Sequence, residues 1–148
     1  MPASKNSVII RRPISEVFAF VADGENASKW RSEHLLDIAH VSGTGVGTVY
    51  RQGVKGPGGR RIGADYELTA YEPSRRLAFK TTVGPVRPNG EFSFEETDDG
   101  TKVSLSLDAE LTGIKKLLLG GAVQKSMETE VKALENIEAA MAERPSAG

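Results

Sequence analysis

Alternation of apolar and polar residues is the feature that most constrains how this chain can fold. In residues 60–71 and 102–111 every second side chain is apolar. A period of two is typical of a strand with one buried and one exposed face. Other segments repeat the pattern or carry short β-branched runs, so we expect seven strands in an antiparallel sheet with one apolar face. The expected strands cover residues 8–10, 35–41, 47–54, 60–71, 75–83, 90–96 and 102–111.

Helical signals lie at two places in the chain. Two short helices are expected after the first strand, one with Ser15 as its N-cap and one over residues 25–31. A long helix is expected from Thr112 or Gly113 to about residue 143, because apolar residues in its second half recur at intervals of three and four. The adjacent glycines at positions 120 and 121 cost ~2 kcal/mol of helix propensity and indicate either a kink or a place where another group comes close. The simplest packing lays this helix across the apolar face of a curved sheet, which gives a fold of the α+β class.

Composition limits the number of domains and the kinds of partner that we expect for this chain. The chain has 148 residues with 39% hydrophobic side chains, which is enough for one domain that folds without disulfides or metal. We expect a single domain over residues 1–148, with its core at about residues 7–142 and flexible ends. Lys and Arg number 19 and Asp and Glu 20, so the net charge of −1 argues against general binding to nucleic acid.

Several kinds of site are excluded or disfavoured by single residue types. Cysteine is absent and the only histidines are His34 and His40, so zinc–thiolate and three-histidine sites cannot form, and no metal or cofactor is expected. Both histidines are expected at the surface, with His34 beside the mouth of any cavity. Residues 43–48 are rich in glycine, but a strand pattern follows them, which favours a hairpin turn over a phosphate loop. No apolar run approaches the ~20 residues of a membrane span, and residues 1–7 begin no signal peptide, so a cytoplasmic protein is expected.

Four segments in this order carry a resemblance to a known family. They are VIIRRPISEVFAFVADGENASKW (residues 8–30), GTGVGTVYR (43–51), ADYELTAYEPSRRLAFKTT (64–82) and FSFEETDDGTKVSLSLD (92–108). Together they resemble the START-like (SRPBCC) helix-grip superfamily, and within it the bacterial polyketide cyclase/dehydrase-like branch, over about residues 7–142. The resemblance implies a seven-stranded antiparallel sheet wrapped around a long C-terminal helix, with a hydrophobic cavity between them. The superfamily includes lipid carriers and aromatic cyclases, so the resemblance leaves both functions open.

The apolar strand faces and the long helix supply the residues expected to line that cavity. Polar candidates at the cavity include Tyr66, Arg51 and Glu91; these three are also the candidates for polarising a carbonyl or moving a proton. The phase of residues 47–54 stays open, because a bulge would exchange Tyr50 for Arg51 on the inner face. The expected lining residues are Trp30, Tyr50, Tyr66, Leu68, Phe79, Thr81, Phe92, Phe94, Leu105, Leu107, Leu118, Val123, Gln124 and Met127.

Two functions follow as hypotheses. The first is binding of a small hydrophobic or amphipathic molecule, such as a lipid or polyketide, between the sheet and the C-terminal helix. The alternative is an aromatase/cyclase-type enzyme that acts on a polyketide-like substrate in the same cavity, without metal or nucleotide. The expected partner is a small hydrophobic molecule rather than nucleic acid, and the protein is expected to be a monomer or a homodimer.

Overall fold

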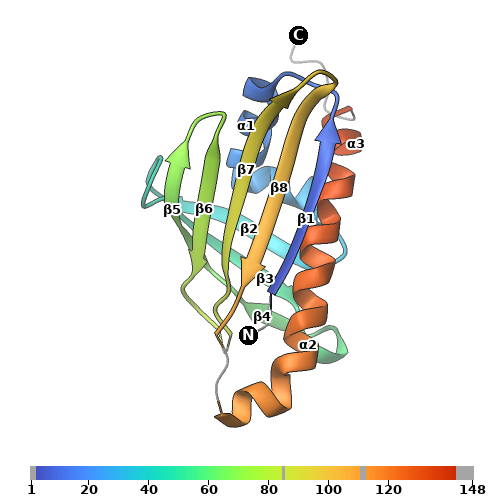
Figure 1. Ribbon diagram of the computed structural model, residues 1–148. Coiled ribbons are helices and arrows are strands. Elements are labelled where there is room, and N and C mark those ends of the chain that lie inside the picture. Colours follow the sequence, from blue (N-terminus) through green and yellow to red (C-terminus); the bar gives the residue numbers. More distant parts are fainter. Residues whose placement is uncertain (1–2, 85, 111–112, 143–148) are drawn as a thin grey trace.

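The structure is a computed structural model that describes residues 3–84, 86–110 and 113–142, with the backbone alone at residues 57 and 113–120. Figure 1 shows a curled sheet with a long C-terminal helix running beside it. In chain order the elements are β1 (Ala3–Ile10), α1 (Ile14–Ala22), η1 (Gly24–Lys29), β2 (Leu35–Ser42), β3 (Val49–Lys55), η2 (Pro57–Gly59), β4 (Arg61–Gly63), β5 (Tyr66–Glu72), β6 (Arg76–Thr81), β7 (Asn89–Thr97), β8 (Gly100–Asp108), α2 (Gly113–Lys132), η3 (Ala133–Asn136) and α3 (Ile137–Ala142).

Seven strands form one antiparallel path in the order β1-β8-β7-β6-β5-β3-β2, and the short β4 pairs with β3 outside that path. The expected α+β helix-grip architecture is therefore confirmed. The prediction of one continuous strand over residues 60–71 is wrong, because the chain breaks at Ala64 and Asp65. There the Ala64 amide donates to the carbonyl of Gln52, and an Asp65 carboxylate oxygen accepts from the Gln52 amide. This divides the segment into β4 and β5, which both pair with β3.

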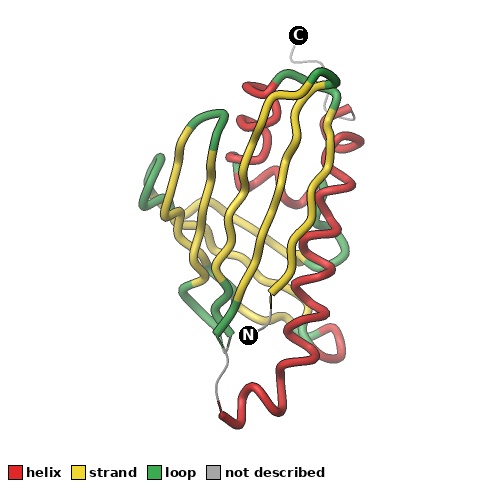
Figure 2. Tube along the Cα trace, in the orientation of Figure 1, coloured by secondary structure: helices red, strands yellow, loops and turns green. Residues whose placement is uncertain are grey.

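The alternation along the strands matches the two faces of the sheet. In β8 the side chains of Val103, Leu105 and Leu107 are buried, while their neighbours in the strand are less so. Figures 1 and 2 show β2 and β3 crossing behind β7 and β8, so the sheet curls around its apolar face. The long helix packs fully buried Leu134 and Ile137 into the core cluster on that concave side.

The short helices form where they were expected, but their caps differ. Helix α1 begins at Ile14 after Pro13, whose carbonyl accepts from the amides of Glu16 and Val17, and no side chain caps it. Ser15 therefore lies inside the helix, and its predicted role as N-cap is wrong. Proline fixes φ near the helical value, so it can begin a helix without a capping hydroxyl.

The long C-terminal helix is less regular than its sequence pattern indicates. The α-helical backbone of α2 passes through Gly120 and Gly121 without interruption, and Figure 1 shows that the first part of α2 bends relative to the rest. A second irregularity, which the sequence did not predict, is the 3₁₀ turn η3 between α2 and α3.

Candidate functional site

A continuous series of aromatic rings crosses the concave face of the sheet. Tyr50 of β3 stacks on Tyr66 of β5, with ring centroids 5.1 Å apart, and Phe79 of β6 lies 5.3 Å beyond Tyr66. Phe92 of β7 continues the series at 6.3 Å, and Trp30 meets Phe92 edge-on at 6.2 Å. Antiparallel pairing produces this arrangement, because Tyr50 lies opposite Tyr66 in the register of β3 and β5.

Most of the residues predicted to line a cavity point to this concave face. The buried ones are Trp30, Tyr50, Tyr66, Leu68, Thr81, Phe92, Phe94, Leu105, Leu107 and Met127. Phe79 and Val123 are partly buried and pack against the core cluster, whereas the side chain of Leu118 lies outside the described residues. Gln124 was placed wrongly, because its amide group binds the backbone of Ala3 at the edge of β1, with distances of 3.0 and 2.7 Å.

Two of the three polar candidates lie on the outer face of the sheet. Tyr50 and Gln52 are buried and Arg51 is exposed, which resolves the phase of β3 and excludes Arg51 from the concave face. Glu91 alternates with buried Gly90 and Phe92, so it also points outwards, where it pairs with Arg76 at 2.9 Å. Of the three candidates, Tyr66 alone lies on the concave face.

The described side chains leave no wide opening between the aromatic series and the helix. Two pockets among the described residues lie away from Tyr50, Tyr66, Phe79 and Phe92. One is an open groove of about 580 Å³ between β1 and the end of the C-terminal helix, around Ile9 and Glu138. The other, of about 100 Å³, lies between residues 30–34 and the helix, against Arg31 and Glu130. Trp30, Tyr50, Tyr66 and Phe92 are each at most 8% exposed, so these rings are enclosed by other described side chains.

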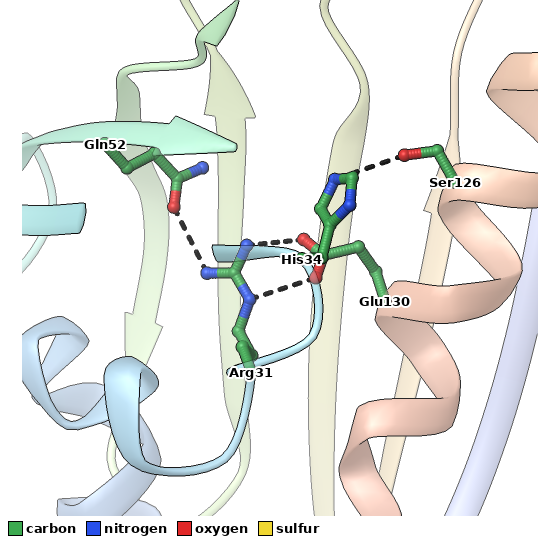
Figure 3. Close-up of polar contacts among 5 residues, drawn as sticks. All are labelled: Arg31, His34, Gln52, Ser126 and Glu130. Atoms are coloured by element: carbon green, nitrogen blue, oxygen red, sulfur yellow. Dashed lines mark hydrogen bonds and ion pairs between the residues drawn. The ribbon is translucent and has the colours of Figure 1, made fainter. Parts of the chain in front are cut away.

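A largely buried ion pair, which the sequence reasoning missed, joins Arg31 to Glu130 (Figure 3). Arg31 follows η1 and reaches across to α2, where its Nε and Nη2 atoms donate to the two carboxylate oxygens of Glu130, the former at 3.2 Å. Its Nη1 atom donates to Oε1 of Gln52 at 3.2 Å. The side chains of Arg31 and Glu130 are only 12% and 18% exposed. Glu130 raises the pKa of Arg31 against the lowering effect of burial, so the guanidinium stays charged.

Residues 30–34, the segment that contains Arg31, make two further hydrogen bonds to the C-terminal helix. The Nε2 atom of His34 lies 3.1 Å from the hydroxyl of Ser126, and the side-chain amide of Asn136 donates to the carbonyl of Trp30 at 3.2 Å. Burial lowers the pKa of His34; the charge of Glu130 opposes this shift, and the charges of Arg31 and Lys55 add to it. His34 is therefore part of the contact between loop and helix, rather than the surface histidine that was expected.

The two tyrosines of the series differ in their hydrogen bonding. The Tyr50 hydroxyl accepts from the backbone amide of Gly24 at 3.1 Å. The Tyr66 hydroxyl lies close to Gly24 as well, but it makes no hydrogen bond to a described residue. Burial raises the pKa of both phenols, most strongly that of Tyr66, so both are neutral donors near pH 7.

Two further properties describe the rest of the chain. In residues 3–84, 86–110 and 113–142, no group of three or more His, Cys, Asp or Glu side chains is placed to hold a metal ion. No helix in this described part is long and apolar enough to cross a membrane.

The fold and site define a helix-grip protein whose concave sheet face is apolar and carries one buried polar cluster. The chain belongs to the family described as polyketide cyclase / dehydrase and lipid transport, whose model matches residues 1–142. No curated protein matches the chain by sequence.

Comparison with solved structures supports the same fold. The chain is similar to TTHA0849 from Thermus thermophilus, with 25% identity and a TM-score of 0.81 over 97% of this chain and 100% of that one. It is also similar in fold to the di-domain ARO/CYC BexL from the BE-7585A biosynthetic pathway, with 19% identity and a TM-score of 0.70 over 99% of this chain and 50% of that one. For the di-domain ARO/CYC StfQ from the steffimycin biosynthetic pathway the identity is 13% and the TM-score 0.75, over 97% of this chain and 52% of that one. This chain spans about half the length of each of the two ARO/CYC proteins.

Proposed function

We propose that this protein binds a small hydrophobic or amphipathic molecule between the concave face of the sheet and the C-terminal helix. The observation that carries the proposal is the aromatic series from Tyr50 to Phe92, which meets one buried polar cluster around Arg31. An apolar wall with a few placed polar groups is the usual composition of a site for a small molecule. The family description, which includes lipid transport, agrees with this proposal.

Binding would require the concave face to open, since its described side chains pack against one another. Two features favour such opening. Phe79 and Val123 are only partly buried, so this part of the core is the less tightly enclosed. Met127 lies on the same side of the helix and is an unbranched side chain that repacks at low cost. A bound ligand would therefore take the place of rearranged side chains rather than fill a space that is already open.

The experiment is a titration with the neutral fluorescent probe N-phenyl-1-naphthylamine, with Trp30 emission as a second signal. We expect saturable binding by the wild-type protein and at least about tenfold weaker binding by Val123→Phe, because the larger ring fills the space between helix and sheet. Ala122→Phe is the matched control: the same ring is added at the neighbouring, exposed position and should leave binding unchanged. Absence of saturable binding, or equal effects of the two variants, would contradict the proposal.

A second candidate function is an aromatase/cyclase-type reaction on a polyketide-like substrate. It is favoured by the Tyr66 hydroxyl, a neutral donor on a buried side chain, which makes no hydrogen bond to a described residue and lies within range of the charge of Arg31. Such a group could polarise a carbonyl or supply a proton in a site that excludes water. With a synthetic poly-β-keto thioester as substrate, Tyr66→Phe should lower turnover about 100-fold while binding of the naphthylamine probe is retained. Wild-type binding of the thioester without turnover would leave the carrier function alone.

A further inference from the structure

A groove outside the concave face lies between β1 and the end of the C-terminal helix. Figure 1 shows β1, an edge strand of the sheet, running beside this helix. Residues 8–10 of β1 form one wall of the groove, and η3 and α3 supply the other. Its volume of about 580 Å³ lies within the range typical of sites for small molecules. No member of the aromatic series lines this groove, which we call the β1–α3 groove, so it is separate from the proposed ligand site.

The β1–α3 groove is lined mainly by apolar side chains. Ile10 and Leu134 form its base, because they are only 1% and 0% exposed and belong to the core. On the helix, Ala139 and Ala142 are exposed, and their methyl groups are too short to fill the space towards β1. Ile9 is 46% exposed and supplies a large apolar surface on the strand. An apolar molecule placed here would remove this surface from water.

The charged side chains that line the groove, among the described residues, are two glutamates of the helix. Glu138 already has a partner, because it accepts from the backbone amide of Arg11 at 3.2 Å and from the Nη2 atom of Arg11 at 3.1 Å. Glu135 forms no ion pair with a described residue, although Lys132 lies three residues earlier in the chain. Within the described part of the chain, the groove therefore combines an apolar surface with one carboxylate whose charge is not compensated.

We propose that the β1–α3 groove is a second binding site, which takes an amphipathic molecule with one positive charge, such as an alkylamine or arylamine. The ammonium group lies at the Glu135 carboxylate, and the apolar body covers Ile9 and Ala139. Burial of the apolar body supplies most of the affinity, because an exposed ion pair contributes little. The carboxylate supplies selectivity, since both glutamates repel an anion of the same size. This site is independent of the proposed function, because it shares no residue with the aromatic series or with the cluster around Arg31.

The test compares two fluorescent ligands, N-dansylcadaverine and N-dansyl-6-aminohexanoate, in titrations at pH 7.5. Both carry the same dansyl group on the same pentamethylene chain, but the first ends in an ammonium group and the second in a carboxylate. The wild-type protein should bind the ammonium compound at least about fivefold more tightly at low ionic strength. This preference should shrink in about 0.5 M NaCl, because salt screens charges at an exposed site.

Two variants locate the binding in the β1–α3 groove. Glu135→Gln should reduce the preference for the ammonium compound by about threefold or more, whereas Glu128→Gln, the matched control, removes the same charge from an exposed position outside the groove. Ala139→Phe places a ring in the groove and should weaken binding of both dansyl compounds at least about tenfold. Ala122→Phe adds the same ring at an exposed position elsewhere on the helix and should have no effect.

Three results would overturn the assignment of this second site. They are equal wild-type affinity for the two dansyl compounds at low ionic strength, equal effects of Ala139→Phe and Ala122→Phe, and a dimer in sedimentation that Ala139→Phe dissociates. The last result would give the groove to a second copy of the chain. Binding of N-phenyl-1-naphthylamine tests the concave face separately, and Glu135→Gln and Ala139→Phe should both retain it. Loss of the dansyl preference with retained naphthylamine binding would therefore remove the second site alone.

Discussion

Breaking the Arg31–Glu130 pair should destabilise the protein far more than breaking an exposed pair. At an effective dielectric constant of about 20, two charges 4 Å apart attract by about 4 kcal/mol, and removal of one partner of a buried pair typically costs about 3–5 kcal/mol. Arg31 and Glu130 keep 12% and 18% exposure, and a glutamine can still accept one hydrogen bond. We therefore expect Glu130→Gln to lower the free energy of unfolding by about 2–3 kcal/mol.

The comparison is the pair of Arg61 with Asp37, which has two hydrogen bonds of 2.8 Å but side chains that are 47% and 52% exposed. Because exposed ion pairs contribute about 0–1 kcal/mol, Asp37→Asn should have little effect. Urea unfolding followed by Trp30 fluorescence and by circular dichroism measures both variants. With a slope of about 2 kcal/mol/M, Glu130→Gln should lower the unfolding midpoint by about 1–1.5 M at an unchanged slope.

The double variant Arg31→Met/Glu130→Met completes the argument. Replacement of both charges by apolar side chains leaves no uncompensated charge, so its free energy of unfolding should return to within about 1 kcal/mol of the wild type. The reasoning is refuted if Glu130→Gln and Asp37→Asn cost the same. It is equally refuted if the double variant is less stable than Glu130→Gln.

Three further predictions concern the surroundings of the site and the core, and each is measured by thermal or urea unfolding. Burial lowers the pKa of His34, so the unfolded chain binds the proton more readily; stability is complete above about pH 6.5 and falls as the pH drops below this value. The variant His34→Asn should remove this fall, and the control His40→Asn should not. Gly24→Ala would place a Cβ atom 2.6 Å from Cε1 of Tyr50, so it should cost about 1–3 kcal/mol through overpacking. Leu134→Ala removes a fully buried side chain of the helix and should cost about 2–5 kcal/mol, while a loss below about 1 kcal/mol would show that the helix packs differently.

The sheet could be predicted from sequence because the alternation of apolar and polar residues within each strand shows which side chains face the core. In β8 the alternation around Val103 and Leu105 is enough to tell which side chains are buried. The division of residues 60–71 could not be foreseen in the same way. It depends on hydrogen bonds that join Ala64 and Asp65 to Gln52, which lies on another strand. Local periodicity contains no information on such cross-strand contacts.

The phase of β3 shows the same limit at the site. Tyr50 and Arg51 are adjacent, and a shift of one residue would exchange the aromatic ring for the guanidinium on the concave face. The pairing of Tyr50 with Tyr66 in the neighbouring strand decides between them. Glu91 was misplaced although its neighbours Gly90 and Phe92 are both buried, because a polar residue was selected for its chemistry rather than for its parity in the strand.

The ion pair could not be predicted, since Arg31 and Glu130 lie 99 residues apart and each resembles an ordinary solvated charge in the sequence. Two weak signals were present. Arg31 directly follows the only tryptophan, and Glu130 lies one helical turn after Ser126, beside the apolar stripe that contains Met127. Neither signal identifies a partner, because side-chain contacts between distant segments depend on the completed fold.

The presence of this pair in an otherwise apolar region bears on its purpose. A buried ion pair stabilises a protein little compared with apolar side chains of similar size, so stability alone does not explain why Arg31 and Glu130 occupy these positions. Glu130 keeps the guanidinium of Arg31 charged and oriented. Two of the five N–H groups of this guanidinium make no hydrogen bond to a described residue. If the double methionine variant is as stable as the wild type and binds the poly-β-keto thioester more weakly, the pair serves recognition.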